Sequence, residues 1–500
     1  MKHFDEDFEK TIKELDSDNP EKVVEEIKEL DKKKKKNDED VIETSFLETE
    51  NEIVEQINNI NPIDNNFTTL TTPSTPKPDN CFLIFNKQTG STTTSDKFIH
   101  NNKVYCPIVD ELLKEGGITL PSGIAEYGTT EELVEELKIF FNKYFQVPDF
   151  YEVFLPYLCL FYWVYERFPF VPYTHFVGRT ATGKSTAMEV FGSVCYKPID
   201  ASGSITMASI FRIVTKWKGT LLLDEFDGAG ENYREMMSFL KSGVSNKVVL
   251  RTEGEGKKEV KAFIVKSPKI FTSENPISNA GLQSRTIVIR MEKNKRRVPL
   301  YRLKPFEEES KLLRNKLLLW RLRTMGTIDL TSIEYGFEAL RGLDARVQQV
   351  ITPIYYMCGE EAKQDIIKFA KEQQDETFRE RRESVDGQIF QFIYDHYNDF
   401  IREITISKIT DSLNAGKNNK FDNISAKRVA NTIRKVLGFD IQRLGDENIS
   451  TVMFDDGEEK MKELYAYYGL PPLSPQSVVD VGSVVKDDII SEAEELFNND

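Results

Sequence analysis

The sequence has few cysteines and histidines, and neither kind is grouped. Its five cysteines are Cys81, Cys106, Cys159, Cys195 and Cys358. The four histidines are equally scattered, and there is no Cys-x-x-Cys pair. This spacing indicates neither a zinc site nor a disulfide framework, so we expect a reducing compartment, the cytoplasm. The N-terminus is acidic and polar, so we expect no signal peptide.

A hydrophobic run long enough to cross a bilayer is also missing, with one near exception. Residues 150–165 are rich in aromatic and aliphatic side chains, but they include Glu152 and Pro156. Glu166 and Arg167 follow directly. A membrane span needs about 20 apolar residues with few or no charges. We therefore expect a buried helix here and no membrane partner.

Net positive charge is the third absence, since the formal net charge is −16. The negative charge is concentrated at the ends of the chain: residues 1–60 hold 20 acidic and 10 basic side chains, and residues 471–500 hold 7 and 1. The remaining residues, 61–470, are neutral overall. A neutral body can still carry local basic patches, so nucleic-acid binding is not excluded.

What the sequence does contain is a phosphate-binding motif. Gly178, Gly183, Lys184 and Ser185 fit G-x-x-x-x-G-K-[ST], the Walker A motif, between an apolar run and a helical segment. Glycines let backbone N–H groups turn toward phosphate oxygens. We expect Lys184 to contact the β- and γ-phosphates of ATP and Ser185 to bind Mg²⁺. The residues expected to contact the nucleotide are Gly178, Thr180, Ala181, Thr182, Gly183, Lys184, Ser185 and Thr186.

A second carboxylate-bearing motif follows forty residues later. The run Thr220-Leu-Leu-Leu-Asp-Glu has the continuous apolar pattern of a parallel strand covered on both faces. Asp224 would hold the Mg²⁺ through water, and Glu225 would orient and deprotonate the attacking water. An ordinary strand end is the alternative interpretation. The pair of motifs predicts hydrolysis of a nucleoside triphosphate.

Residues 247–265 form two β-runs around a Gly-rich tip, which predicts a hairpin. Lys257 and Lys258 lie at the tip, and Arg251 lies on an arm. The functional interpretation is a loop that contacts the phosphate backbone of a strand passing through a ring. The alternative is a solvated hairpin without a ligand.

Three further residues are candidates for sensing the γ-phosphate. Asn275 follows an apolar strand and would polarise the attacking water, although Thr272 or Ser273 could do so instead. Arg285 precedes the next apolar strand and would reach the γ-phosphate of a neighbouring subunit. Residues 333–357 are helical in pattern, and within them Arg346 is a candidate second sensor, with Arg341 as the nearby competitor.

The flanking segments divide into arms, a linker and a lead-in module. We expect an acidic and lysine-rich, partly disordered arm over 1–60, a linker over 61–80, and an acidic disordered tail over 471–500. Within the first arm, Val23, Val24, Ile27 and Leu30 have helical spacing. The alternative for the acidic arms is docking of other replication proteins. Residues 81–170 form a lead-in module with bracing helices, one of them capped at Thr129, and the ATPase domain spans 171–365.

Residues 386–468 have the element order of a winged helix: helix, strand, helix, helix, hairpin. Pattern predicts helices over 388–397, 407–413 and 426–437, and strands over 403–406, 440–444 and 450–454. Lys427, Arg428 and Arg434 would meet DNA phosphates from the third helix. The alternative is a winged helix that binds protein.

The segment from about 110 to 360 resembles the AAA+ ATPases that phages, plasmids and other mobile elements encode as replicative helicases, near the minichromosome-maintenance and superfamily-3 helicases. Its motifs at 178–185, 221–225, 247–265, 273–276 and 282–285 occur in that order. The resemblance implies an α/β P-loop core with a parallel sheet, flanking helices and an inserted hairpin. It also implies a hexameric ring, ATP sites at subunit interfaces and translocation on DNA. No primase constellation is visible in 1–110, so primer synthesis is not expected.

Two function classes remain open. The first is an ATP-driven DNA helicase, and the second is a replication initiator or helicase loader that binds DNA and uses ATP for assembly without unwinding. A P-loop kinase or transporter subunit fits less well, because it would not explain Glu225, the sensor strand and Arg285 together.

Overall fold

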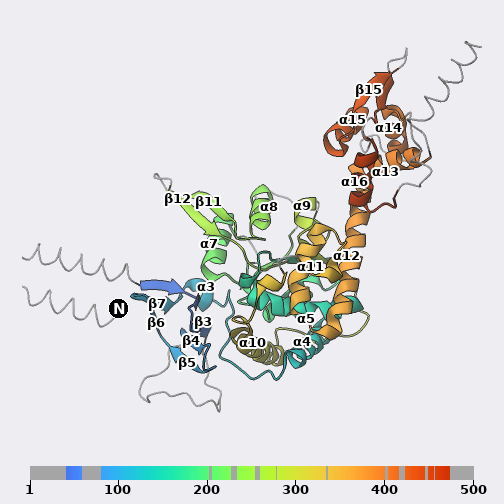
Figure 1. The fold of residues 1–500 in the computed structure, drawn as a ribbon. Coiled ribbons are helices and arrows are strands. Elements are labelled where there is room, and N and C mark those ends of the chain that lie inside the picture. The colour runs from blue at the N-terminus through green and yellow to red at the C-terminus, as the bar shows by residue number, and fades with distance from the viewer. Residues whose placement is uncertain are drawn as a thin grey trace, which may run out of the picture. The chain divides into compact units, whose positions relative to one another are not determined.

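The computed structural model divides into two units, residues 1–369 and 370–500, which we treat separately (Figure 1). The described residues are 41–58, 80–201, 205–226, 233–253, 259–277, 279–333, 336–399, 404–415, 423–444, 449–454 and 457–472. The predicted arm before residue 41, most of the linker, the hairpin tip with Lys257 and Lys258, and the tail from residue 473 lie outside these ranges.

A small β module begins the described chain. Four strands form an antiparallel sheet in the order β2-β3-β4-β5, and three form a second sheet in the order β1-β7-β6, in which β1 is parallel to β7. The strands are β1 Val41–Thr44, β2 Phe46–Glu48, β3 Glu52–Asn58, β4 Asn80–Asn86, β5 Thr92–Ser95, β6 Phe98–His100 and β7 Lys103–Pro107. The prediction of an arm up to residue 60 differs from this, since β1–β3 occupy 41–58. The reason is that Glu55 and Gln56, polar residues typical of a solvated segment, are buried with partners.

Glu55 connects the β module to the rest of the first unit. Its carboxylate is 1% exposed and lies 3.0 Å from Nζ of Lys197 and 2.7 Å from Nε of Arg321. The hydroxyl of Tyr196 donates to it at 3.0 Å, and Arg321 also pairs with Glu166. A buried carboxylate is tolerated only with such partners, because its desolvation is costly. The β module is therefore held to the helices and strands that follow.

Three helices brace the central sheet: α3 (Glu111–Lys114), α4 (Thr130–Tyr144) and α5 (Asp149–Val164), with the short 3₁₀ turn η1 (Tyr165–Arg167) after them. The predicted cap of α4 is confirmed, since Thr129 and Glu132 exchange hydrogen bonds in a capping box. Every residue from Phe154 to Val164 is buried, as expected for this apolar segment. No helix in the described part of the chain has the length and apolar character that a membrane span requires.

The central sheet has five parallel strands in the order β14-β8-β13-β10-β9. They are β8 Tyr173–Val177, β9 Ile199–Asp200, β10 Leu221–Leu223, β13 Lys269–Ser273 and β14 Thr286–Arg290. All residues of β8, β10 and β13 are buried, as in a sheet covered on both faces. The predicted α/β parallel sheet is confirmed. Because the strands are parallel, the segments that follow β8, β10 and β13 meet at one edge.

Helices α6 (Lys184–Ser193), α7 (Met207–Trp217), α8 (Tyr233–Ser242) and α9 (Ala280–Gln283) connect these strands. The buried residues of α7 join those of α8 and of the sheet in one core. The predicted hairpin is confirmed: β11 (Val248–Glu253) pairs antiparallel with β12 (Glu259–Ile264). The hairpin projects beside α7 (Figure 1).

The chain after the sheet is helical. It comprises α10 (Lys304–Thr324), the 3₁₀ turns η2 (Leu330–Ile333), η3 (Glu338–Leu340) and η4 (Glu360–Ala362), α11 (Ala345–Met357) and α12 (Lys363–Glu383). The sequence predicted one helical stretch over 333–357, whereas α11 begins only at Ala345. Gly336 and Gly342 have φ of 72° and 90°, and a left-handed backbone interrupts a helix. Asp344 then caps α11 by accepting from the N–H of Arg346.

The second unit has the elements α13 (Val385–Asn398), α14 (Ile406–Asn414), α15 (Ala426–Thr432), the π-helical turn η6 (Ile433–Leu437), β15 (Ile441–Leu444), β16 (Ile449–Val452) and α16 (Gly457–Tyr468). The predicted helices and hairpin are present. The predicted strand over 403–406 is reduced to a bridge between Thr405 and Thr451, because α14 begins at Ile406. An additional helix, α16, packs on α13, with the rings of Phe390 and Tyr468 stacked at 5.0 Å.

Candidate nucleotide site at the carboxyl edge of the sheet

The phosphate-binding motif lies between β8 and α6. Ala181 and Gly183 have φ of 64° and 86°, which gives the loop its tight curl. A Cβ on Gly178 would lie 2.6 Å from the carbonyl oxygen of Met291, so only glycine fits there. Nζ of Lys184 donates to the carbonyl oxygens of Gly178 at 2.7 Å and Arg179 at 2.9 Å. The loop thus holds the ammonium against its own backbone, at the start of α6.

Two threonines of the loop use their hydroxyl groups in hydrogen bonds with neighbouring protein groups. The hydroxyl of Thr182 donates to the carbonyl oxygen of Arg179 at 2.8 Å, and that of Thr180 donates to the carboxylate of Glu274. Thr186 lies in the first turn of α6. Glu274 follows β13 and was not among the predicted residues; its contact with Thr180 joins the loop to the neighbouring strand end.

Asp224 is the centre of the hydrogen bonds at this edge. Its Oδ1 accepts from the hydroxyls of Ser185 at 3.0 Å and Thr272 at 2.5 Å, and from the N–H of Glu225 at 3.1 Å. Ser185 and Asp224, predicted from two motifs to share a Mg²⁺, are therefore in direct contact. Sequence reasoning missed this role of Thr272. Its hydroxyl also accepts from the N–H of Glu225 at 3.0 Å.

Glu225 has an unusual backbone for its residue type, with φ of 53°. The left-handed conformation costs a non-glycine residue about 1 kcal/mol, and such strain concentrates at functional sites. Its N–H donates to Oδ1 of Asp224 and to the hydroxyl oxygen of Thr272, and these two hydrogen bonds maintain the conformation. The side chain is exposed, and its carboxylate pairs with no described residue. It is thus available to a water molecule at the edge.

The end of β13 distinguishes the three candidates for polarising that water. The hydroxyl of Thr272 is engaged with Asp224. The hydroxyl of Ser273 donates to the carbonyl oxygen of Asn275 and lies 2.7 Å from Nε2 of His175. The Asn275 side chain is exposed and makes no hydrogen bond to the residues that the structure describes. The geometry therefore favours Asn275.

His175, on β8, is buried directly behind this edge. Burial lowers its pKa to about 3, with a smaller contribution from the charge of Arg290. Its Nδ1 is buried and has no hydrogen-bond partner among the described residues. The histidine is therefore neutral at physiological pH. Arg290 on β14 is paired in register with Val177, the last residue of β8, so it lies beside the start of the phosphate loop. Arg290 was not among the predicted site residues.

Arg285 lies at the opposite edge of the sheet. Its carbonyl oxygen accepts from the N–H of Tyr173, the first residue of β8, whereas the phosphate loop begins after Val177, the last. Five residues of strand separate the two edges by about 16 Å. Burial and then the charge of Arg346 lower the pKa of Arg285, so the two arginines are close enough to repel. Neither has an acidic partner among the described residues, whereas Arg341 pairs with Glu338 at 3.1 Å.

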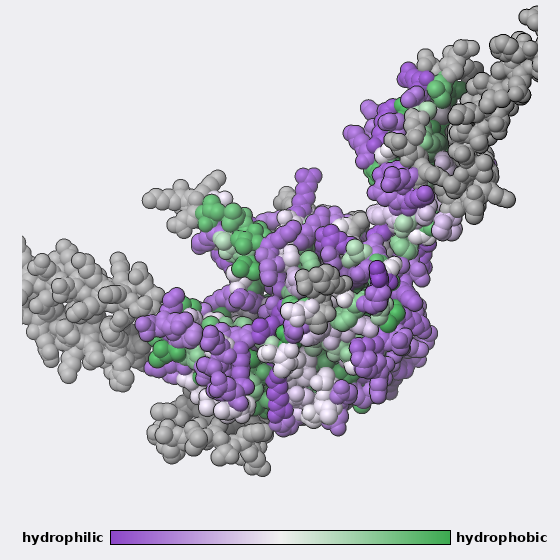
Figure 2. All heavy atoms as spheres, in the orientation of Figure 1, coloured by the Kyte–Doolittle hydropathy of each residue, from purple (hydrophilic) through white to green (hydrophobic). Residues whose placement is uncertain are grey.

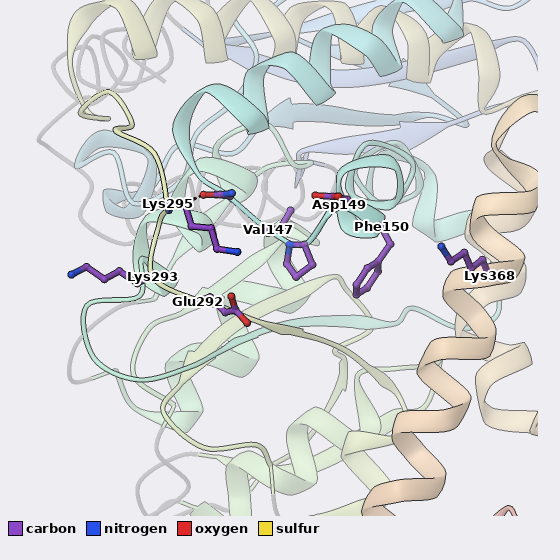
Figure 3. Close-up of a pocket in the computed structure, with 9 residues that line it drawn as sticks. Val147, Asp149, Phe150, Glu292, Lys293, Lys295 and Lys368 are labelled. Carbon is purple, nitrogen blue, oxygen red and sulfur yellow. Dashed lines mark hydrogen bonds between the residues drawn. The ribbon is translucent and has the colours of Figure 1, made fainter.

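A cavity of about 430 Å³ opens beside the phosphate loop. Residues that precede β8 and residues that follow β14 line it, together with Lys368 of α12; they are Gln146, Val147, Pro148, Asp149, Phe150, Glu292, Lys293, Lys295 and Lys368 (Figure 3). Asn294, between two of the lysines, has its Nδ2 within 4.0 Å of where a Cβ of Gly183 would be. Its Oδ1 is buried and has no partner in the described chain. The cavity is therefore next to the loop, with an unused acceptor between them.

The predicted DNA contacts are distributed over both units. On the hairpin, Arg251 pairs with Glu235 at 2.5 Å and lies over the ring of Phe211, so it is held against α7 and α8. Lys257 and Lys258 lie outside the described residues. In the second unit Lys427 and Arg434 line a groove of about 600 Å³ between α14, α15 and the hairpin β15–β16. Arg443, which was not predicted, lines it too, and Arg428 is exposed on α15.

No protein-family model and no curated protein matches this sequence. Among solved structures, two that are titled as apo structures of the NrS-1 C-terminal region have 13% and 11% sequence identity to it. Their TM-scores are 0.34 and 0.35, and each comparison covers 72% of this chain and 82% of the other. Because these values are low, we assign function from the residues of the site alone.

Proposed function

We propose that the protein is a Mg²⁺-dependent ATPase that works as a DNA helicase in replication. The observation that carries the ATPase assignment is the contact between Ser185 and Asp224 at 3.0 Å, with Glu225 as the next residue. This contact joins the phosphate loop to the carboxylate motif at one edge of the sheet. Lys184 would then hold the β- and γ-phosphates, and Glu225 would accept a proton from the attacking water.

The oxygen atoms of Ser185 and Asp224 fit Mg²⁺, which prefers oxygen ligands and usually keeps phosphate and water in its shell. No group of three or more His, Cys, Asp or Glu side chains in the described chain would hold a metal alone. A cation here would thus depend on the nucleotide. When bound, Mg²⁺ would neutralise charge on the phosphate oxygens.

The cavity beside the loop would take the base of ATP. Phe150 and Lys295 extend toward the same space from opposite walls (Figure 3). The unpaired Oδ1 of Asn294 would accept from the amino group of adenine, since a buried acceptor without a donor is costly.

Arg285 supports the proposal that the site is completed by a second copy. The length of β8, about 16 Å, separates it from the phosphate loop of its own chain. It can therefore serve a γ-phosphate only in a neighbouring subunit. A pair of arginines without acidic partners is suited to bind such an anion. We propose that the copies form a ring, which the family resemblance makes a hexamer.

The helicase assignment rests on the hairpin, and the loader remains the second candidate. Arg251 is engaged with Glu235, so the tip lysines would provide the contact to single-stranded DNA. The basic groove of the second unit would add a contact to double-stranded DNA. The acidic arms would bind other replication proteins.

Strand displacement separates the two candidates. The full-length protein carrying Lys257→Ala and Lys258→Ala is compared with the wild type on a forked duplex with Mg·ATP. Helicase action predicts unwinding below a tenth of wild type, with DNA-independent ATPase within twofold. The control carries Lys114→Ala and Lys304→Ala, two exposed lysines. Normal unwinding by the tip variant would refute the motor role of the tip, and no unwinding by the wild type would favour the loader.

A further inference from the structure

The hairpin β11–β12 exposes an apolar face. Val248, Leu250, Val260 and Ile264 are 55%, 67%, 66% and 48% exposed. The register pairs Val248 with Ile264 and Leu250 with Ala262, so alternate positions of both strands place these side chains on one face. Figure 2 shows them as a green patch on the projecting hairpin. Contiguous exposed apolar side chains of this kind mark a contact surface.

The opposite face of the hairpin is already packed. Phe263 is buried against the ring of Phe211 on α7 at 5.7 Å, and Val249 packs on the same core. Arg251 lies over Phe211 from the same side. A two-stranded antiparallel sheet is marginally stable by itself. Apolar residues on both of its faces are typical of a sheet that packs against other elements on both faces. The exposed face therefore requires a partner.

The chain before residue 41 leaves the fold next to this hairpin. Glu43 on β1 pairs with Lys216 of α7 at 3.3 Å. The adjacent residue of α7, Thr215, donates its hydroxyl to the carbonyl oxygen of Ile264 at 3.3 Å. The base of the hairpin and the first described strand thus contact adjacent residues of α7.

The preceding segment is long enough to reach the exposed face. Eleven residues separate Val41 from Leu30, and in extended form they span about 36 Å. The six paired positions of the hairpin ladder span about 20 Å. Residues 21–31 can therefore reach the face without any movement of β1.

The composition of residues 21–31 fits the face. Val23, Val24, Ile27 and Leu30 have the spacing of one helix face. The described residues of the exposed hairpin face, Val248, Leu250, Thr252, Val260, Ala262 and Ile264, include no charged side chain. The two surfaces are thus complementary in apolar pattern.

We propose that residues 21–31 form an amphipathic helix that packs its apolar stripe onto the outer face of β11–β12 in the same chain. Ile27 then lies over Leu250, and the acidic side chains of the helix face solvent. The proposal does not depend on the ATPase or helicase activity of the protein.

Disulfide trapping tests the contact. In a Cys106→Ser background of the full chain, Ile27→Cys is combined with Leu250→Cys; the other four native cysteines are buried. The control combines Ile27→Cys with Leu312→Cys, because Leu312 is 50% exposed on α10. After mild oxidation we expect more than half of the test chains to carry the 27–250 disulfide in the monomer band, and under a tenth of control chains to be linked. Linkage no higher than the control, or linkage only between chains, overturns the proposal.

A dye measurement gives an independent readout without cysteines. Ile27→Asp with Leu30→Asp should uncover the face and raise the fluorescence of an apolar-surface dye at least twofold. Adding Leu250→Ser and Val260→Ser should remove that increase. An unchanged signal in the first variant would contradict the proposal.

Discussion

The two edges of the central sheet differ in how their functional side chains are satisfied. At the carboxyl edge, Ser185, Asp224 and Thr272 bond to one another, and Lys184 bonds to its own loop. At the amino edge, Arg285 and Arg346 repel each other and have no acidic partner among the described residues. Under the proposed function, the carboxyl edge is a preformed nucleotide site, and the amino edge is the half that a second copy would supply. One chain would then hold both halves without being able to bring them together.

The largest effect should come from the preformed edge. Lys184→Ala removes the ammonium that holds the phosphates, so we expect both ATP binding and turnover to be lost, with turnover reduced at least about 10³-fold. Binding of a fluorescent ATP analogue and steady-state phosphate release measure the two effects. Lys304→Ala, an exposed lysine on α10, is the control and should change neither. Retained turnover in the first variant would mean that the loop is not the nucleotide site.

Arg285→Ala tests the half-site at the amino edge. We expect normal ATP binding and a turnover lower by about 10³–10⁵-fold, the range for an arginine that acts between subunits. Mixing this variant with Lys184→Ala should restore part of the activity, because a Lys184→Ala subunit supplies the arginine to an intact loop. Arg323→Ala, which removes the exposed pair with Glu126 and the contact with the Tyr127 ring, is the control. Absence of rescue in the mixture would assign Arg285 a structural role.

Glu225→Gln separates chemistry from binding within the carboxyl edge. The substitution leaves the backbone N–H bonds to Asp224 and Thr272 in place, but a side-chain carboxamide cannot accept a proton. Turnover should therefore fall about 10²–10⁴-fold, with the affinity for ATP unchanged. Glu274→Gln is the matched control, because among the described residues its carboxylate contacts only Thr180 and its loss should lower turnover less than tenfold. Equal loss in both variants would argue against a base at position 225.

The smallest effect concerns His175 behind that edge. Its pKa is about 3 in the folded chain and near 6.5 when unfolded, so only the unfolded state gains the proton as the pH falls below 6.5. The contribution of His175 to the free energy of unfolding is complete above pH 6.5 and decreases as the pH falls toward 3. Between pH 6.5 and pH 5 the decrease is about 2 kcal/mol. His175→Gln should abolish this part of the decline in denaturant titrations. A pH dependence identical to wild type would show that the histidine is charged in the fold.

The sequence predicts much of the carboxyl edge because local rules decide it. Glycines mark the loop, and the apolar run before Asp224 marks a doubly covered strand. The capping box at Thr129 and the hairpin register follow from equally local chemistry. The contact of Thr272 with Asp224 could not be predicted, because it depends on β13 lying between β8 and β10.

Elsewhere the prediction failed where tertiary contacts override composition. The strands over 41–58 include Glu55 and Gln56, whose burial is possible only because distant partners satisfy them. The long helix predicted over 333–357 ignored Gly336 and Gly342, whose backbone is left-handed. The DNA contacts and the winged-helix interpretation of the second unit stay predictions.

Glu55 has a practical consequence for anyone who isolates the part of the chain that contains the parallel sheet. A fragment that starts near residue 110 retains Lys197 and Arg321 but lacks the carboxylate that lies between them. Two desolvated cations would then face each other across an empty position, which typically costs 3–5 kcal/mol. We therefore expect such a fragment to aggregate on expression more than a fragment that starts at residue 41.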